Sequence, residues 1–265
     1  MSTIVFLHAH PDDEAIFTGG TMYRLAEAGH RVVLVVATGG ERGSSHTALA
    51  GGHTVAAVRA RETLASAALL KVPRVEFLGY EDSGLPGDPA NHWPGAFAAA
   101  SIDEAAARLA AICQAEGAAA LCGYDPGGIY RHPDHLQVHR VGARAAQLAD
   151  LPTVYEATVD HEYLHFVDVH LVEGASQSLA ERSRHSGASP QAPSRVGLPT
   201  AEITTVIDVR RCLDVKRAAM HAHASQIAAT DVPLTPAQFA AVYGFEWFVR
   251  RGPAGPIEKA GLPWV

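Results

Sequence analysis

Cysteine is scarce in this 265-residue chain, which contains only three. Cys113, Cys122 and Cys212 are widely spaced and form no CxxC pair, so neither a disulfide framework nor a thiolate zinc site is indicated. Long apolar runs are also absent: no stretch approaches the roughly 18 residues of a membrane span, and no basic segment precedes the first apolar run. We therefore expect reduced, mostly buried cysteines in a cytoplasmic protein without a membrane span.

The chain lacks a basic run as well. Its formal net charge of −7 and its isoelectric point near 6.1 argue against a nucleic-acid or anionic-membrane binder, because such partners need a concentrated positive patch. A mean hydropathy of +0.03 with 18% charged residues is typical of a globular protein rather than a disordered one. We expect a small-molecule partner, and the pattern leaves open whether the chain forms a homo-oligomer.

Strand-like and helix-like segments alternate along the first half of the chain. The strand-like runs are residues 4–7, 31–37, 74–78 and 118–122, and the helix-like segments are residues 14–28, 54–70 and 101–116. Thr54 and Ser101 are placed as N-caps, and Gly29 and Gly117 as C-terminal stops. Such alternation predicts right-handed βαβ units. The expected fold class is α/β: a Rossmann-like, doubly wound, mainly parallel sheet with helices on both faces.

A long irregular segment interrupts this rhythm at residues 174–200, where Ser, Gly, Ala and Pro dominate without a clear period. Such composition predicts a loop, which is either a substrate lid or a solvent-exposed surface loop. A strand at residues 203–209 and a helix from near Arg210 are expected after it. Because the sequence shows no internal repeat and no second independent core, we expect a single domain over residues 1–265.

Two polar motifs follow strand-like runs: HAHPDDEA, residues 8–15, after the first, and GYDPGGIYRHPDH, residues 123–135, after the fourth. In an open parallel sheet, ligands bind beyond the carboxyl ends of the strands, so the two motifs are expected to face one another. The first loop lacks GxGxxG, and the chain lacks GxxxxGKS or GxxxxGKT, which disfavours a bound nucleotide. Adjacent carboxylates beside histidines instead indicate a divalent cation that removes their repulsion, and zinc suits such ligands.

An isolated HPDH would favour a simple helix-capping turn. AHPDDE at residues 9–14 together with HPDH at residues 132–135, however, resembles the PIG-L/LmbE-like family of zinc-dependent de-N-acetylases. The family includes deacetylases of N-acetylglucosaminyl-phosphatidylinositol, of mycothiol and bacillithiol precursors, and of glycopeptide antibiotics. Similar stretches are TGGERG at 38–43, RARETLASAALL at 59–70, LGYEDSGL at 78–85 and DVKRAAMHAHASQ at 214–226. The likeness fails mainly over residues 91–100 and 174–200, which are candidates for substrate specificity.

The resemblance implies a metal site with proton-transfer groups around it. It makes His10, Asp13 and His135 the ligands of Zn²⁺, and such a set with open positions also suits Fe²⁺. It implies the following roles for the remaining motif residues: Asp12 as general base, His132 as general acid, Asp134 as the residue orienting His132, and Tyr130 as a stabiliser of the tetrahedral intermediate. Arg131 stands where several relatives carry glycine.

Three further residues are candidates for binding substrate at the same edge of the sheet. Glu41 and Asp82 follow the second and third expected strands, and Arg59 lies on the helix between those strands. Strand-end placement and the family resemblance motivate this hypothesis. The alternative for each residue is a loop cap or a surface ion pair.

The remaining polar residues near the motifs fit supporting roles. His8 lies one residue outside the ligand pattern, and His139 shares a helical face with His135. His223 belongs to the helix after the long loop and could either approach the site or stay structural. Glu14 is expected to begin the first helix and to interact with its N-terminus rather than with the metal.

We predict a zinc-dependent hydrolase that removes an acetyl group from an N-acetylglucosamine-type small glycoconjugate, releasing acetate and a free amine. In such a reaction zinc polarises the amide carbonyl and lowers the pKa of water, while the base and acid move protons. The same residues would serve an amidase acting on a larger N-acyl or thiol-conjugate amide. Two less favoured functions are a non-catalytic sugar-binding module and a metal-dependent phosphoesterase, and for the phosphoesterase the motifs offer few carboxylates.

Overall fold

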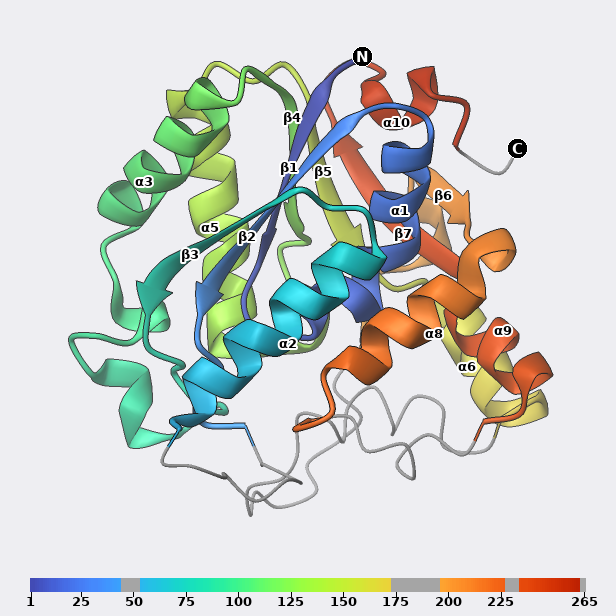
Figure 1. Cartoon of the computed structure of the whole chain (residues 1–265), viewed down its shortest axis with the longest axis horizontal. Helices are drawn as coiled ribbons and strands as arrows, with labels where there is room; N and C mark the ends of the chain where they lie inside the picture. The colour runs from blue at the N-terminus through green and yellow to red at the C-terminus, as the bar shows by residue number, and fades with distance from the viewer. Residues whose placement is uncertain (44–52, 173–195, 227–233, 263–265) are drawn as a thin grey trace.

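The computed structural model describes residues 1–43, 53–172, 196–226 and 234–262. Its seven strands form one sheet in the order β3-β2-β1-β4-β5-β7-β6 (Figure 1). The strands are β1 (Thr3–His8), β2 (Arg31–Thr38), β3 (Arg74–Tyr80), β4 (Ala118–Tyr124), β5 (Val154–Thr158), β6 (Thr205–Asp208) and β7 (Phe245–Arg251). Neighbouring strands from β3 to β5 pair in parallel, and β7 pairs antiparallel with both β5 and β6. The predicted α/β class with a mainly parallel sheet is confirmed.

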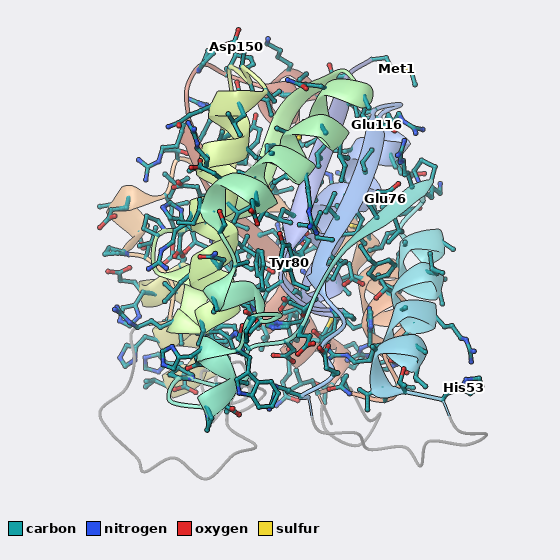
Figure 2. The ribbon with its side chains drawn as sticks, turned by 90° about the vertical axis from the view of Figure 1, so that its left-hand side faces the viewer. Met1, His53, Glu76, Tyr80, Glu116 and Asp150 are labelled. Atoms are coloured by element: carbon teal, nitrogen blue, oxygen red, sulfur yellow. The ribbon has the colours of Figure 1, made fainter. Side chains whose placement is uncertain are left out.

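Helices cover both faces of the sheet, as the sequence predicts. One layer contains α1 (Gly19–Glu27), α2 (Val55–Leu69) and α8 (Leu213–Ala222), and the other contains α3 (Ile102–Ala115) and α5 (Pro133–Leu148) (Figures 1 and 2). The central strands β1 and β2 are buried along nearly their whole length. This explains their continuous apolar runs, because a parallel strand covered on both faces has no solvent side. The core lies between these layers and the sheet.

Local signals fix most helix ends where the sequence places them. The side chains of Thr54 and Ser101 each accept a hydrogen bond from the backbone N–H three residues later, as N-caps do. Gly29 and Gly117 have positive φ angles of 80° and 56°, a conformation in which glycine ends a helix without strain. The predicted helix at residues 14–28 differs: it begins as a π-helical turn, Glu14–Thr18, before α1 starts.

The remaining elements complete the sheet and its ends. They are the helices α4 (Gly128–Arg131), α6 (His161–His170), α9 (Pro236–Tyr243) and α10 (Pro256–Lys259), together with short 3-10 turns. Most of the predicted loop at residues 174–200 lies outside the described residues. Its last part is described, and Leu198 there forms a bridge with Asp160. No helix in the described ranges has the length and apolar character needed to cross a membrane.

Candidate active site

The two polar motifs meet at the carboxyl ends of β1 and β4, which are neighbours in the sheet. The chain leaves β1 toward α1 on one face and leaves β4 toward α5 on the other, so the site lies where the winding of the sheet changes direction. The ring of His10 lies 4.6 Å from that of His132 and 5.3 Å from that of His135, measured between centroids. The predicted contact between the motifs is present.

Asp13 connects the two histidines expected to bind metal. Its Oδ2 atom lies 3.3 Å from His10 Nδ1 and 3.3 Å from His135 Nε2, and all three side chains are buried. Burial opposes the charge on Asp13, but the neighbouring His135 and His10 outweigh it and hold its pKa well below the usual value. His10, His132 and His135 also bring ring nitrogens within 4.8 Å of one another, so the cluster has the donors to hold a metal ion.

The second ring nitrogen of His10 is held by Asp134. His10 Nε2 lies 3.1 Å from Asp134 Oδ2, and Asp134 in turn accepts hydrogen bonds from the backbone N–H and hydroxyl of Ser83. Burial disfavours a charged His10, but Asp82, Asp13 and Asp134 outweigh it and raise its pKa well above the usual value. A carboxylate on the outer nitrogen is the arrangement that orients metal-binding histidines. It leaves His10 Nδ1 directed toward Asp13.

His132 has a helix-capping role. It is the N-cap of α5, and its Nδ1 accepts a hydrogen bond of 3.2 Å from the backbone N–H of Asp134. Because Nδ1 accepts, the ring carries its proton on Nε2. Burial, followed by the nearby His10 and His135 rings, holds its pKa well below the usual value. The hydrogen bonds of the Asp134 carboxylate go to His10 and Ser83, and an orienting effect of Asp134 on His132 stays a prediction.

Tyr130 directs its hydroxyl into the same cluster. The Tyr130 oxygen lies 3.0 Å from His135 Nε2, the atom that also faces Asp13. The backbone around it is unusual, because Ile129 and Arg131 have φ angles of 64° and 69°. That region favours glycine, the residue that the family resemblance implies at the position of Arg131.

Asp12 has a backbone conformation that few side-chain-bearing residues adopt, with a φ angle of 98°. Its backbone N–H donates to Glu14 Oε2 at 3.0 Å, and its carboxylate lies 3.4 Å from the Arg59 guanidinium. The Asp12 side chain is 20% exposed, unlike the buried groups around it. Burial raises its pKa, and the positive charge of Arg59 opposes that change. Asp12 is therefore a carboxylate at the open side of the cluster.

Comparison with known proteins identifies this arrangement. The PIG-L family model, described as GlcNAc-PI de-N-acetylase, matches residues 5–146, more than half of the chain. The chain belongs to the PIG-L family. The predicted family and the predicted enzyme class, a hydrolase acting on amide C–N bonds, are confirmed.

Two relatives of this PIG-L chain carry the name 1D-myo-inositol 2-acetamido-2-deoxy-alpha-D-glucopyranoside deacetylase. The protein of that name from Thermobispora bispora is 35% identical, over 98% of this chain and 91% of its own, and that from Acidothermus cellulolyticus is 39% identical over 85% and 80%. Among solved structures, N,N'-diacetylchitobiose deacetylase from Pyrococcus horikoshii matches with a TM-score of 0.61 at 21% identity, covering 94% of this chain and 84% of that one. That likeness shows the fold.

The three predicted substrate residues lie beside the PIG-L site but are already engaged. Glu41 Oε1 accepts a 2.9 Å hydrogen bond from the backbone N–H of Asp82, and Asp82 Oδ1 lies 3.7 Å from His10 Nε2. The side chain of Arg59 is 4% exposed and donates to the carbonyls of Pro11 and Gly40. Arg59 therefore forms no surface ion pair; it holds the loops that carry Asp12 and Glu41.

The remaining polar residues form hydrogen bonds beside the PIG-L site. His8 Nδ1 and Nε2 each lie 2.9 Å from a hydroxyl, those of Tyr124 and Thr18. His139 Nδ1 contacts the carbonyl of Tyr124 at 3.1 Å. His223 reaches the site region, where its Nε2 lies 2.6 Å from Glu14. Sequence reasoning missed Ser83; its place after β3, one residue beyond Asp82, was the available signal.

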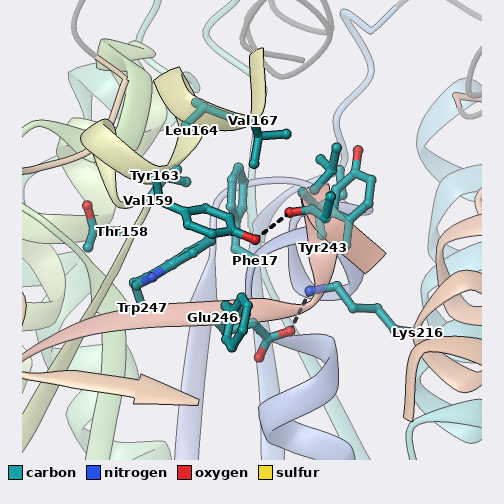
Figure 3. A pocket seen from close by; sticks show the side chains of 14 residues that line it. Phe17, Thr158, Val159, Tyr163, Leu164, Val167, Lys216, Tyr243, Glu246 and Trp247 are labelled. Atoms are coloured by element: carbon teal, nitrogen blue, oxygen red, sulfur yellow. Dashed lines mark hydrogen bonds and ion pairs between the residues drawn. The ribbon is translucent and has the colours of Figure 1, made fainter. Parts of the chain in front are cut away.

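A mostly apolar pocket adjoins the PIG-L site (Figure 3). Its walls come from α6, α9 and β7, and the buried pair Lys216 and Glu246 forms part of its lining. Phe17 belongs to both regions, because it lines the pocket while its ring lies 6.3 Å from that of His135. The π-helical turn after HPDDE thus separates the pocket from the histidine cluster.

Proposed function

We propose that this chain is a zinc-dependent deacetylase that removes the N-acetyl group from a GlcNAc-inositol conjugate, leaving acetate and a free amine. One observation carries the proposal: a single oxygen of Asp13 lies 3.3 Å from nitrogens of both His10 and His135, in a family of de-N-acetylases. The names of the two relatives from Thermobispora bispora and Acidothermus cellulolyticus support the substrate class. Action in the cytoplasm and homo-oligomer formation stay predictions.

The donor set suits zinc. Ligand atoms bound at about 2.0–2.1 Å to a tetrahedral zinc ion lie about 3.3 Å apart, which is the separation between Asp13 Oδ2 and each histidine nitrogen. His10, Asp13 and His135 would hold the ion, and Fe²⁺ fits the same two-histidine, one-carboxylate set. When bound, the metal supplies a Lewis acid for the amide carbonyl and lowers the pKa of water.

The protein's own groups would then move the protons. Asp12, whose carboxylate is partly exposed beside the cluster, takes the proton of the attacking water as general base. His132 would act as general acid in its imidazolium form, and because its Nδ1 faces the α5 backbone, Nε2 is the atom that would give its proton to the departing amine. The Tyr130 hydroxyl, 3.0 Å from His135 Nε2, is placed to donate to the developing oxyanion.

The test is amine release by the zinc-loaded protein from a panel of N-acetylglucosaminides that includes GlcNAc-inositol. We compare the parent with Asp12→Asn, because asparagine tolerates positive φ and so removes the base without straining the backbone. Asp150→Asn is the matched control: Asp150 also has positive φ, 51°, and lies in the turn between α5 and β5, at the opposite edge of the sheet (Figure 2).

We expect amine release by the parent and by Asp150→Asn, and a loss of about 10²–10⁴-fold in Asp12→Asn with its zinc retained. Equal rates in all three proteins would contradict the assigned base. Longer N-acyl and thiol-conjugate amides in the same panel separate the amidase alternative by its acyl preference. Two bound metals per chain, together with release of phosphate from a phosphate ester, would favour the phosphoesterase instead.

A further inference from the structure

Glu14 joins the strained residue Asp12 to the C-terminal part of the chain. Its Oε2 atom accepts the backbone N–H of Asp12 at 3.0 Å, and its Oε1 atom lies 2.6 Å from Ser66 Oγ and 2.6 Å from His223 Nε2. Glu14 and His223 are both fully buried. The carboxylate therefore has one oxygen for Asp12 and the other for partners on α2 and at the end of α8.

His223 is itself held in place. It is the C-cap of α8, and the next turn is tied to α2, because Ser225 donates its backbone N–H and its hydroxyl to Glu62 at 2.8 and 2.6 Å. The helix α8 packs against both α2 and the π-helical turn that contains Glu14. His223 lies outside residues 5–146, the part of the chain that the family model matches.

We propose that His223 and Glu14 are positioning residues for Asp12, with His223 acting through Glu14 to hold the Asp12 backbone in its left-handed conformation. This inference rests on the proposed function, in which Asp12 is the general base. An aspartate keeps a φ of 98° only where its surroundings determine that conformation. The Asp12 carbonyl is fixed as well, since it accepts from the N–H groups of Ala15 and Ile16 at 3.1 and 3.2 Å.

The direction of the Asp12 carboxylate follows from this backbone conformation. If Glu14 moved, the N–H of Asp12 would lose its acceptor, and the residue would relax toward negative φ, which turns its side chain away from its present direction. A displaced base slows the reaction of the bound substrate but leaves substrate binding unchanged. The expected signature of losing His223 is therefore a lower kcat at unchanged KM.

The experiment uses the zinc-loaded, full-length protein and His223→Gln, Glu14→Gln and the double variant. We expect His223→Gln to lower kcat per zinc-loaded molecule by at least about tenfold, with KM within about twofold and zinc content unchanged. Because His223 acts through Glu14, the double variant should lose no more than the worse single variant. Additive losses, or a change in KM alone, would overturn the proposal.

Lys216→Met is the matched control. Lys216 is also on α8, is equally buried and pairs with a carboxylate, Glu246, at 2.5 Å (Figure 3). Glu246, however, accepts the backbone N–H groups of Gly20 and Thr21 at the start of α1, not that of Asp12. Lys216→Met should lower the thermal stability while leaving kcat within about threefold of the parent. An equal fall in kcat in both variants would show general loosening rather than positioning.

Hydrogen exchange at the Asp12 amide gives a readout that does not depend on catalysis. His223→Gln should speed exchange at that amide beyond any change in global stability, and Lys216→Met should not. Unchanged exchange at the Asp12 amide in His223→Gln would refute the positioning of Asp12 by His223 and Glu14, even if activity fell. If the parent releases no amine from any substrate, the proposed function fails. The exchange experiment still decides whether His223 and Glu14 position the Asp12 backbone.

Discussion

The Tyr130 hydroxyl, 3.0 Å from the His135 nitrogen assigned to the metal, gives a test of oxyanion stabilisation at a single atom. Tyr130→Phe removes the hydroxyl and keeps the ring, whose centroid lies 4.5 Å from that of His135. We expect kcat to fall by roughly a hundredfold, because one preorganised oxyanion donor is worth about that much, while KM and zinc content stay near those of the parent. Steady-state kinetics check this, and an unchanged kcat would remove Tyr130 from the mechanism.

Arg59 distinguishes a substrate contact from a structural support. Its buried guanidinium donates to the carbonyls of Pro11 and Gly40 and lies 3.4 Å from Asp12. Arg59→Met would leave two carbonyls without their donor, so we expect the free energy of unfolding to fall by about 2–4 kcal/mol. Urea unfolding measures this loss. A raised KM with an unchanged unfolding midpoint would instead identify Arg59 as a substrate contact.

At the same scale, the sequence predicts which residues meet but not which atoms they use. Both motifs follow strands, and the carboxyl ends of neighbouring parallel strands share an edge, so the encounter of His10 with His132 and His135 follows from the pattern. The partner of Asp134 does not follow. His132 Nδ1 is occupied by the first turn of α5, and the Asp134 carboxylate turns to His10 and Ser83. Such choices depend on tertiary packing, which spacing alone does not encode.

Among the elements, the short local signals are reliable and the non-local ones are not. Caps and stops at Thr54, Ser101, Gly29 and Gly117 depend on neighbouring residues alone, and the structure confirms them. The sequence pattern did not predict β5 or β7, and β7 pairs antiparallel with β5, so that Val154 pairs with the distant Arg251. The π-helical turn was missed as well; its first residue, Glu14, bonds to Ser66 and His223, which are distant in sequence.

Two adjacent glycines at the start of α1 test how closely this helix packs. A Cβ atom at Gly20 would lie 2.5 Å from the Cβ and Cγ1 atoms of Val209, whereas one at Gly19 would meet its nearest atom at 3.4 Å. Gly20→Ala should therefore lower the free energy of unfolding by about 1–3 kcal/mol. Gly19→Ala should leave it unchanged or raise it by up to about 1 kcal/mol through helix propensity. Thermal unfolding of the two variants decides, and equal shifts would contradict the packing argument.

At the scale of the whole molecule, one group of ion pairs lies at the end of the sheet opposite to the histidine cluster. The histidine cluster lies at the carboxyl ends of β1 and β4. At the amino ends, Glu116 accepts from Arg31 at the start of β2, with an N–O distance of 2.6 Å, and from Arg74 at the start of β3 (Figure 2). Glu116 is the C-cap of α3, so one carboxylate connects a helix and two strands far from the site. Changes there should alter stability without altering catalysis.

Glu116→Gln tests this separation through its pH dependence. The hydrogen bond from Arg31, followed by the charges of Arg31 and Arg74, lowers the pKa of Glu116 although partial burial opposes the charged form. A carboxyl group with a lowered pKa stabilises the fold above its unfolded pKa of about 4.3 and loses that contribution as the pH falls through the folded value. At pH 7 the variant should be less stable by about 1 kcal/mol, and the difference should shrink below about pH 4.

Urea unfolding at pH 7 and pH 3.5 measures both differences, with deacetylation at pH 7 expected to match the parent. A difference that persists unchanged at pH 3.5 would mean that Glu116 acts through packing rather than charge.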